Sequence, residues 1–226
     1  VILTIKKLNG LIQDITIVRD VVVLEETYAK SAIIDNEGAR IGYIKLPKFY
    51  ADFNKSGGRS AADDVEKEIA KLKAENVNGI ILDLRGNGGG SLRDAIEMTG
   101  HFIEQGPVVQ VKGRYTPAEV MKDNDKTVSY EGPLVVMINQ FSASASEILA
   151  AAIQDYDRGI ILGSASSFGK GTVQRFFELD RYLTASASQY RPLGAVKITT
   201  HKFYRINGDA TQLKGVESDI VVPTQY

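Results

Sequence analysis

Cysteine is absent from the 226 residues of this chain, and histidine occurs only twice. Without cysteine there can be no disulfide, no thiolate nucleophile and no zinc–thiolate site, although this absence fits a reducing and an oxidising compartment equally well. The two histidines are His101, in a predicted helix, and His201, in a predicted β segment. A histidine-based catalytic triad is therefore poorly supplied, and we expect no metal site.

An excess of either charge is also missing. Lysine plus arginine number 27 against 28 acids, so the chain offers no basic field to nucleic acid or to an anionic membrane. Its longest apolar runs are far shorter than a membrane span, and a hydrophobic fraction of 43% suffices for one sizeable core. The first residue, Val1, lies inside a predicted strand, with neither an initiator methionine nor a signal peptide. We therefore expect a fragment of a longer protein, with any targeting segment outside it.

The predicted elements divide the chain into three parts. Residues 1–20 contain two β-rich runs around Asn9-Gly10, which is a strong hairpin signal. Residues 21–40 are charged and mixed, and we interpret them as a connector with one short strand near Ser31–Ile34. From Ile41 onward strands alternate with helices, which predicts a layered α/β domain over residues 41–226.

Three helices are expected in that domain. The first covers residues 60–76 with Ser60 as its N-cap, the second follows the glycine-rich turn at 86–91, and the third runs from Ser144 to about Tyr156. The expected strands between these helices are 41–46, 79–84, 108–112, 133–139 and 159–163.

The glycine-rich stretch around Lys170 does not match the two motifs that it suggests. A P-loop needs four residues between its glycines and a hydroxyl residue after the lysine, but five residues separate Gly163 from Gly169 and Gly171 follows Lys170. The S-x-x-K motif needs Ser167 and Lys170 on one helical turn, and two nearby glycines, each costing about 1 kcal/mol, oppose a helix there. Taken alone, Lys170 is a loop lysine in solvent.

A second glycine cluster, GNGGGS at residues 86–91, follows a predicted strand. It matches the dinucleotide-binding fingerprint only weakly, since its last position is Ser91 and the next strand ends in lysine instead of an acid for the ribose. Its backbone N–H groups, at a helix N-terminus, would suit an anion or an oxyanion. A tight strand-to-helix turn would use the same glycines, so both interpretations stay open.

Ser144 lies at the predicted start of the third helix, in the run FSASASE. With Glu147 it forms an S-x-x-E capping box, which is the interpretation that this element alone favours. The alternative is a nucleophilic serine, because a helix N-terminus stabilises developing negative charge. Such a serine needs a base, and Lys170 could replace histidine if burial beside Phe168 and the close packing of its flanking glycines desolvated the amine.

Together these runs resemble one family. FSASASEILAAAIQDYDRG and GSASSFGKGTVQ closely resemble the C-terminal processing, or tail-specific, serine peptidases. The resemblance continues in GIILDLRGNGGGSL and KFYRINGDATQLKGVESDIVVP, and spans about Ile41 to Pro223. Several separated motifs that agree in order and spacing are more specific than any one of them. The resemblance implies a crotonase-like (ClpP/crotonase) α/β core of repeated ββα elements over 41–226, and it identifies residues 1–20 as the final strands of a truncated PDZ domain.

The resemblance also implies roles for individual residues. These are nucleophile for Ser144, general base for Lys170, orientation of the lysine for Gln174, a supporting acid for Asp155, and oxyanion-hole amides for Ala145 and Gly89. The segment before Lys170 is one residue longer than the commoner family form, but it lies in a loop, where an insertion is cheap. Because Lys170 would serve Ser144, we expect the nearby Ser167 to be replaceable by alanine.

The implied function is a serine endopeptidase for unfolded or C-terminally exposed protein segments, with no metal, cofactor, nucleotide or nucleic-acid partner. An adaptor or a homo-oligomer fits the family, as does a periplasmic or cell-envelope location. Two alternatives stay open: a catalytically idle module that binds C-terminal peptides and, more remotely, a crotonase-type acyl-CoA enzyme that would not need Ser144. The joint presence of Ser144, Lys170 and Gln174 favours the peptidase, because an idle module has no chemical reason to keep all three.

Overall fold

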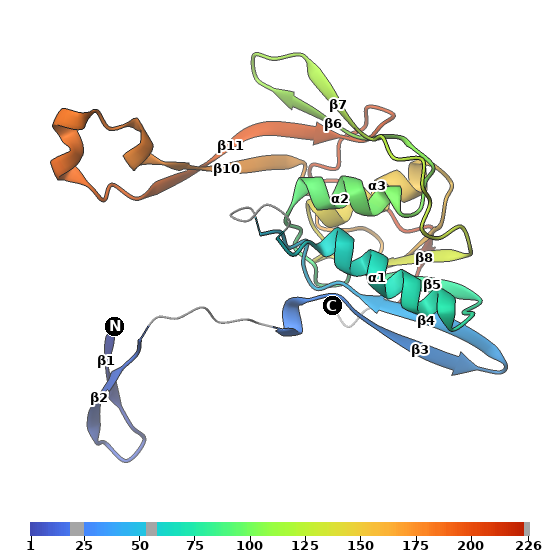
Figure 1. Ribbon diagram of the computed structural model, residues 1–226, viewed down its shortest axis with the longest axis horizontal. Helices are drawn as coiled ribbons and strands as arrows, with labels where there is room; N and C mark the ends of the chain where they lie inside the picture. Colours follow the sequence, from blue (N-terminus) through green and yellow to red (C-terminus); the bar gives the residue numbers. More distant parts are fainter. Residues whose placement is uncertain (19–24, 53–57, 224–226) are drawn as a thin grey trace.

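The computed structural model describes residues 1–18, 25–52 and 58–223. A six-stranded sheet with the order β12-β9-β8-β5-β4-β3 forms the base of the domain (Figure 1). Within this sheet β12, β9, β8, β5 and β4 are all parallel to one another, and the edge strand β3 pairs antiparallel with β4. The strands are β3 (Lys30–Asn36), β4 (Ala39–Lys45), β5 (Gly79–Asp83), β8 (Leu134–Ile138), β9 (Ile160–Gly163) and β12 (Ile220–Val221). The predicted layered α/β domain is confirmed.

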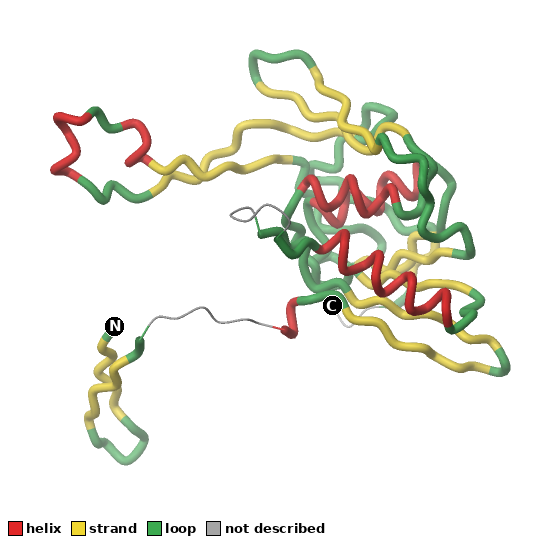
Figure 2. The backbone as a smooth tube through the Cα atoms, in the orientation of Figure 1, coloured by secondary structure: helices red, strands yellow, loops and turns green. Residues whose placement is uncertain are grey.

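A second sheet, of four antiparallel strands, has the order β10-β11-β6-β7. Its strands are β6 (Gly106–Gly113), β7 (Ala118–Asp123), β10 (Thr172–Glu178) and β11 (Ala195–Tyr204). Two 3-10 helices, η2 (Leu179–Tyr182) and η3 (Ala185–Tyr190), join β10 to β11. Figure 2 shows that β10 and β11 leave the body of the domain as a long arm with these helical turns at its tip.

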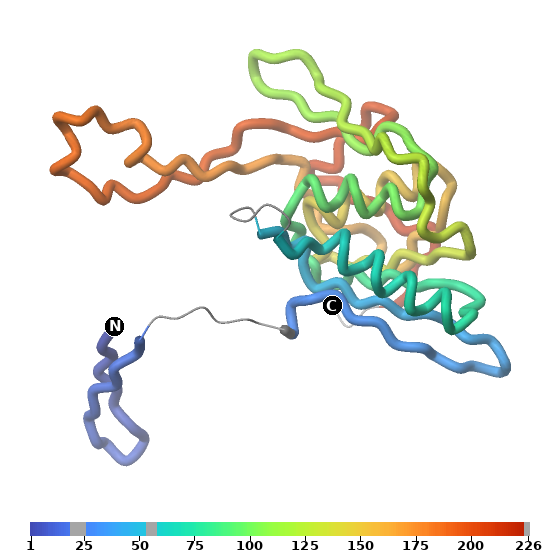
Figure 3. The backbone as a smooth tube through the Cα atoms, in the orientation of Figure 1, coloured from blue at the N-terminus to red at the C-terminus, as the bar shows by residue number. Residues whose placement is uncertain are grey.

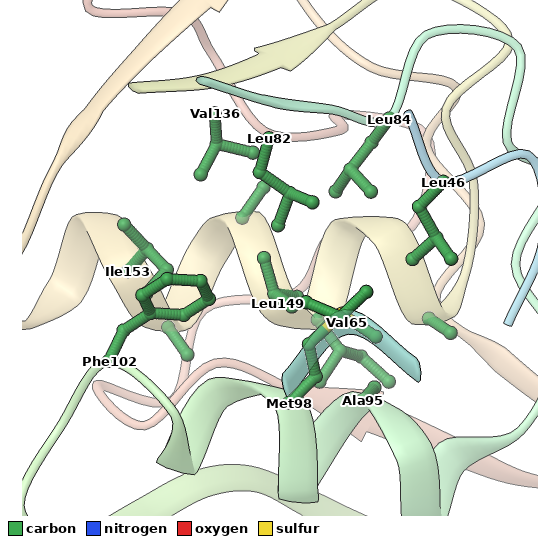
Figure 4. Close-up of a cluster of buried hydrophobic side chains, with 14 of the residues drawn as sticks. Leu46, Val65, Leu82, Leu84, Ala95, Met98, Phe102, Val136, Leu149 and Ile153 are labelled. Atoms are coloured by element: carbon green, nitrogen blue, oxygen red, sulfur yellow. The ribbon is translucent and has the colours of Figure 1, made fainter. Parts of the chain in front are cut away.

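The three predicted helices are present as α1 (Ala61–Ala74), α2 (Leu92–Gly100) and α3 (Ala145–Asp155). The Ser60 hydroxyl accepts the N–H of Asp63 at 3.1 Å, which confirms the predicted cap of α1. Helix α3 is buried from Ala145 through Ile153, because it lies between the large sheet and α2. Figure 4 shows its Leu149 and Ile153 among side chains of the sheet on one side and of α2 on the other.

Some elements differ from the prediction. Strand β3 begins at Lys30 and belongs to the main sheet, so the segment predicted as a connector contributes to the core. Helix α2 ends at Gly100, which makes His101 its C-cap instead of a mid-helix residue, with Nε2 3.0 Å from the carbonyl oxygen of Ala62. The hairpin is confirmed as β1 (Ile2–Lys6) and β2 (Ile12–Thr16), and a 3-10 helix η1 (Glu25–Thr27) precedes β3. The end of the predicted hairpin region at 19–20, the start of the predicted connector at 21–24 and residues 53–57 lie outside the described residues.

The parallel strands place four loops at one edge of the main sheet. Because β4, β5, β8 and β9 are neighbours that run in the same direction, the chain leaves all four at their carboxyl ends. Figure 3 follows these segments, which are far apart in sequence, to adjacent strands. In open α/β sheets this edge is where ligands bind. Across the described residues no helix combines the length and the apolarity that crossing a membrane would require.

Candidate active site

A cleft of about 940 Å³ opens at this edge of the main sheet. Loops that follow β4, β5, β8 and β9 line it, together with the first half of β10. Five of the six predicted site residues share this lining, namely Ser144, Ala145, Gly89, Lys170 and Gln174. The structure therefore brings together residues that are up to 85 positions apart, counted from Gly89 to Gln174.

The three serines of the run 142–146 have different surroundings. The Ser142 hydroxyl donates to the carbonyl of Leu84 at 2.9 Å, and the Ser146 hydroxyl donates to the carbonyl of Asn87 at 2.8 Å. Both side chains are fully buried, and both attach the start of α3 to the loop after β5. Ser144 is only half-buried and lines the cleft. Of the three, Ser144 is the hydroxyl available to a substrate.

The backbone of Ser144 differs from that of the ordinary N-caps in this chain. Ser60 and Ser91 have extended backbones, with φ of −125° and −66°, and each hydroxyl accepts a helix N–H. Ser144 has φ 58° and ψ −112°, a region that a residue with a Cβ rarely adopts and that costs of order 1–3 kcal/mol. Strain of this kind persists only where the surroundings impose it, and it is typical of functional sites.

The carboxylate of Glu147 imposes this arrangement. It is fully buried, and each oxygen accepts two hydrogen bonds. Oε2 accepts the N–H of Ser144 at 2.7 Å and the N–H of Lys170 at 2.9 Å. Oε1 accepts the hydroxyl of Ser167 and the N–H of Gly169, both at 2.6 Å. The predicted capping box of Ser144 and Glu147 is therefore present, and the same carboxylate also fixes the loop that carries the predicted base.

This network overturns the expectation that Ser167 is dispensable. Ser167 is 5% exposed, and its hydroxyl donates to Glu147 while accepting the N–H of Val216 at 2.7 Å. Alanine at this position would leave a buried N–H without its partner and remove one donor from the carboxylate, at about 1–3 kcal/mol. Sequence alone showed Ser167 as a loop residue, since its partners lie 20 and 49 positions away.

Lys170 lies in an irregular loop between β9 and β10, which agrees with the prediction that no helix forms there. The loop is fixed closely, because a Cβ at Gly171 would lie 2.8 Å from the backbone nitrogen of Gln212. Phe168 is 61% exposed and Lys170 is half-buried, so the predicted burial of the lysine beside Phe168 is not confirmed. Within the described residues no hydrogen bond joins the Lys170 amine to the Ser144 hydroxyl, although both side chains line the same cleft.

The predicted oxyanion-hole residues flank Ser144 closely. A Cβ on Gly89 would lie 2.8 Å from the Cβ of Ser144 and 3.0 Å from the nitrogen of Ala145, so only glycine fits there. The N–H of Gly89 donates to Oδ1 of Asn87 at 2.9 Å, and the Asn87 Nδ2 donates to the carbonyl of Leu46 at 2.9 Å. Asn87 is fully buried and had no signal in the sequence beyond its place in a glycine turn. It holds the turn against the loop after β4.

Comparison with known proteins gives the family. The model of "Peptidase family S41" matches residues 40–222. The chain belongs to peptidase family S41. This confirms the family of C-terminal processing, or tail-specific, serine peptidases expected from the sequence motifs, and with it the prediction of a serine-type peptidase at the level of the family.

Several relatives of this S41 chain are known. It is 47% identical over 209 residues to the tail-specific protease of Haemophilus influenzae, covering 92% of this chain and 28% of the relative. It is 36% identical over 211 residues to the carboxy-terminal-processing protease of Bartonella bacilliformis, covering 92% and 43%. The chain thus spans less than half of these relatives.

Solved structures share the fold. The photosystem II D1 C-terminal processing protease superposes with a TM-score of 0.70 at 24% identity, over 93% of this chain and 52% of that one. Mature CPAF complexed with lactacystin gives a TM-score of 0.65 at 13% identity, over 98% and 63%. At these identities the likeness establishes the α/β fold of the S41 chain.

Asp155 is the predicted site residue that the structure does not bring to the cleft. It ends α3, and its carboxylate accepts two bonds from Nε of Arg205, both at 3.1 Å, and one from a terminal guanidinium nitrogen at 2.6 Å. The two side chains are 8% and 15% exposed. At 1.5 Å per residue, the eleven positions from Ser144 correspond to roughly 16 Å along the helix. Any support from Asp155 therefore acts through the helix or through Arg205.

A second carboxylate, missed by sequence analysis, anchors the glycine turn of the S41 chain. Asp83 ends β5 with a fully buried side chain, and accepts bonds from the N–H and the guanidinium of Arg85, from Lys45 at 3.1 Å and from the Tyr43 hydroxyl. Burial alone would raise the pKa of Asp83, but the bonds from Arg85 and Tyr43 and the charge of Lys45 lower it to about 2. The carboxylate is thus ionised wherever the protein is expected to work.

Within the described residues there is no cluster of three or more histidines and acids that could hold a metal ion. The chemistry available at the cleft is that of a hydroxyl, an amine and backbone amides.

Proposed function

We propose that this chain is the catalytic core of a serine endopeptidase in which Ser144 is the nucleophile and Lys170 the general base. The observation that carries the proposal is the contrast among three neighbouring serines. Ser142 and Ser146 are buried and bonded to the loop after β5, whereas Ser144 lines the cleft in a strained backbone conformation beside Lys170. Backbone strain at a hydroxyl that lines a cleft is typical of functional sites, and it supports a nucleophilic role for Ser144 in addition to its place at the helix start.

In the proposed reaction, the Ser144 oxygen forms a bond to the substrate carbonyl carbon while the neutral Lys170 amine accepts the hydroxyl proton. The tetrahedral intermediate collapses as the peptide C–N bond breaks, and the leaving nitrogen takes that proton from Lys170. Water, activated by the same amine, then hydrolyses the acyl-serine. Since no hydrogen bond joins the amine to the hydroxyl in the described residues, the side chain of Lys170 would move onto Ser144 as substrate binds, and apo geometry of this kind is common. We assign the orientation of that amine to Gln174, which follows a bulge in β10.

The negative oxygen of the intermediate would lie at the N-terminus of α3. The N–H of Ala145 is the first of that helix, where the helix dipole also favours negative charge. Gly89 would supply the second N–H, which requires that it leave Oδ1 of Asn87 when substrate arrives. The glycine is already placed against Ser144, so a small peptide rotation would suffice.

We further propose unfolded or C-terminally exposed protein segments as substrates, because the relatives are named for tail-specific and carboxy-terminal processing. The division into residues 1–20 as the end of a PDZ domain and 41–226 as a crotonase-like core belongs to this proposal, as do a periplasmic or cell-envelope location and an adaptor or homo-oligomeric partner. The exposed apolar residues of the hairpin support the first point, because an isolated two-stranded hairpin is only marginally stable in water.

The test is hydrolysis of an unfolded reporter protein by the full-length protein and by its Ser144→Ala variant. We expect the variant to lose activity and to keep its fold. Ser60→Ala is the matched control, since it removes a true N-cap at a cost of about 1 kcal/mol and should keep full activity. Activity should persist in EDTA and without ATP. Near wild-type cutting by Ser144→Ala would make Ser144 a cap only, and binding without cutting by the wild type would indicate the idle module.

A further inference from the structure

The charged side chains that line the cleft are all cationic. Among the described residues, its lining includes five cationic side chains and no carboxylate. The chain as a whole has 27 cationic and 28 acidic residues, so the cleft is much richer in cations relative to acids than the whole chain is. Besides the proposed base Lys170, the cations are Lys48, Arg93, Arg175 and Lys197.

Three of these cations have no anionic partner in the part of the chain that the structure describes. Arg93 pairs with Glu97 at 2.6 Å, but Lys48, Arg175 and Lys197 form no ion pair with any described residue. The Lys197 amine lies 5.3 Å from the centre of the Phe176 ring, which leaves its charge free for a ligand. Lys48 belongs to the loop after β4, whereas Arg175 and Lys197 belong to β10 and β11. Positive charge therefore reaches the cleft from two separate parts of the fold.

The acids are gathered elsewhere. A neighbouring hollow of about 650 Å³, between α1, α2 and β7, has five carboxylates in its lining. Its basic residues are His101, Lys122 and Arg93, and Arg93 also lines the cleft. The carboxylates are those of Asp63, Glu66, Glu97, Asp123 and Asp125. Although the numbers of cationic and acidic residues are almost equal in the whole chain, the two kinds of charge are unevenly distributed, and cationic side chains gather at the proposed active site.

We propose that the cleft selects polypeptide segments that carry aspartate or glutamate side chains close to the scissile bond. A cleft lined by one sign of charge focuses its field and raises the local concentration of oppositely charged ligands. Lys48, Arg175 and Lys197 are the specificity-determining residues. The inference rests on the proposed peptidase function and adds its substrate class.

A substrate offers carboxylates from two sources, acidic side chains and the free C-terminus. Peptides that are acetylated at one end and amidated at the other contain only the first source. We would compare one such peptide in three versions, with Glu, Gln or Lys at the two positions on either side of the scissile bond, and add a fourth version with Gln and a free carboxylate.

Values of kcat/KM for the full-length protein should follow the order Glu, Gln, Lys, with about a tenfold span between Glu and Lys at about 0.05 M salt. The span should shrink to about twofold at 1 M salt, where the screening length falls to ~3 Å. Arg175→Gln and Lys197→Gln should each reduce the preference for Glu, mainly through KM. Arg114→Gln should not, because Arg114 lies outside the cleft against Tyr115.

Equal rates for the three capped peptides would overturn the inference, and so would discrimination by the free carboxylate alone. Binding of the same labelled peptides to the Ser144→Ala protein separates this inference from the proposed function. A Glu preference in binding without any cutting by the wild type would retain the charge selection and reject the peptidase. Cutting by the wild type without a preference for Glu would support the peptidase and reject the charge selection.

Discussion

Replacing Glu147 by glutamine tests the network that joins the proposed nucleophile to the proposed base. The carboxylate accepts two hydrogen bonds on each oxygen, from Ser144 and Lys170 on one and from Ser167 and Gly169 on the other. Glutamine keeps the shape but has only one oxygen. Whichever way its amide is turned, its NH2 group faces two donors.

The size of the effect follows from these contacts. Two hydrogen bonds to a buried charge are lost and at least one backbone N–H is left unpaired, at about 1–3 kcal/mol for each lost partner, or about 2–6 kcal/mol in all. For a domain of this size each kcal/mol lowers Tm by about 2–4 °C, so we expect a decrease of roughly 4–24 °C. Because the same carboxylate positions Ser144 and Lys170, kcat should also fall roughly 10²-fold at temperatures where the variant is folded.

Calorimetry and steady-state kinetics of the full-length protein measure both effects. Glu178→Gln is the matched control, since Glu178 forms an exposed pair with Arg181 and its loss should cost less than about 0.5 kcal/mol. If Glu147→Gln does not fold, Ser167→Ala removes one donor at about 1–3 kcal/mol and tests the same network. A Tm within 2 °C of wild type together with an unchanged kcat for Glu147→Gln would refute the reasoning.

Three further predictions concern charged residues. Lys170→Arg should lower kcat by at least about 10³-fold, because a guanidinium cannot accept the serine proton, whereas Lys48→Arg in the same cleft should stay active. The pKa of Asp83 is about 2 in the folded chain against an ordinary 3.8, so its ionised form contributes about 2 kcal/mol above pH 4 that is lost as the pH falls to 2. Urea midpoints of wild type and Asp83→Asn should therefore differ at pH 6 and converge near pH 2. Asp155→Asn should lower the free energy of unfolding by about 3–5 kcal/mol, because the largely buried Arg205 loses its anionic partner. Adding Arg205→Gln should restore part of that stability. A lower kcat at unchanged stability would instead show that Asp155 takes part in the chemistry.

The elements that sequence analysis predicted are those with a strong local pattern. Helices α1 and α3 have apolar periodicity and serines at their starts, and the parallel strands are short apolar runs. Strands β7 and β10 were missed, because they are mostly exposed and their polar and aromatic residues show no regular alternation. Their pairing with distant strands forms them, and no local pattern records that pairing.

The site divides in the same way. The family motifs named the residues that line the cleft, but burial and long-range partners decided what each one does. Glu147 looked like a cap and is also the anchor of the Lys170 loop, 22 and 23 positions further on. Phe168 was expected to cover the lysine but is exposed. Asp155, which the family resemblance implied as a supporting acid, pairs with Arg205, 50 positions away. Local sequence patterns do not show contacts between residues that are so far apart in the chain.

Because every loop of the proposed active site leaves the carboxyl ends of the parallel strands, the opposite edge of the sheet is free for modification. There the turn between β3 and β4 consists of Glu37 and Gly38, both exposed and both with positive φ. A short peptide tag or a fluorescent label inserted between them would extend a surface turn that bears no catalytic or binding group. The protein could then be immobilised or followed by light while it turns over, with the reporter on the far side of the sheet from the reaction.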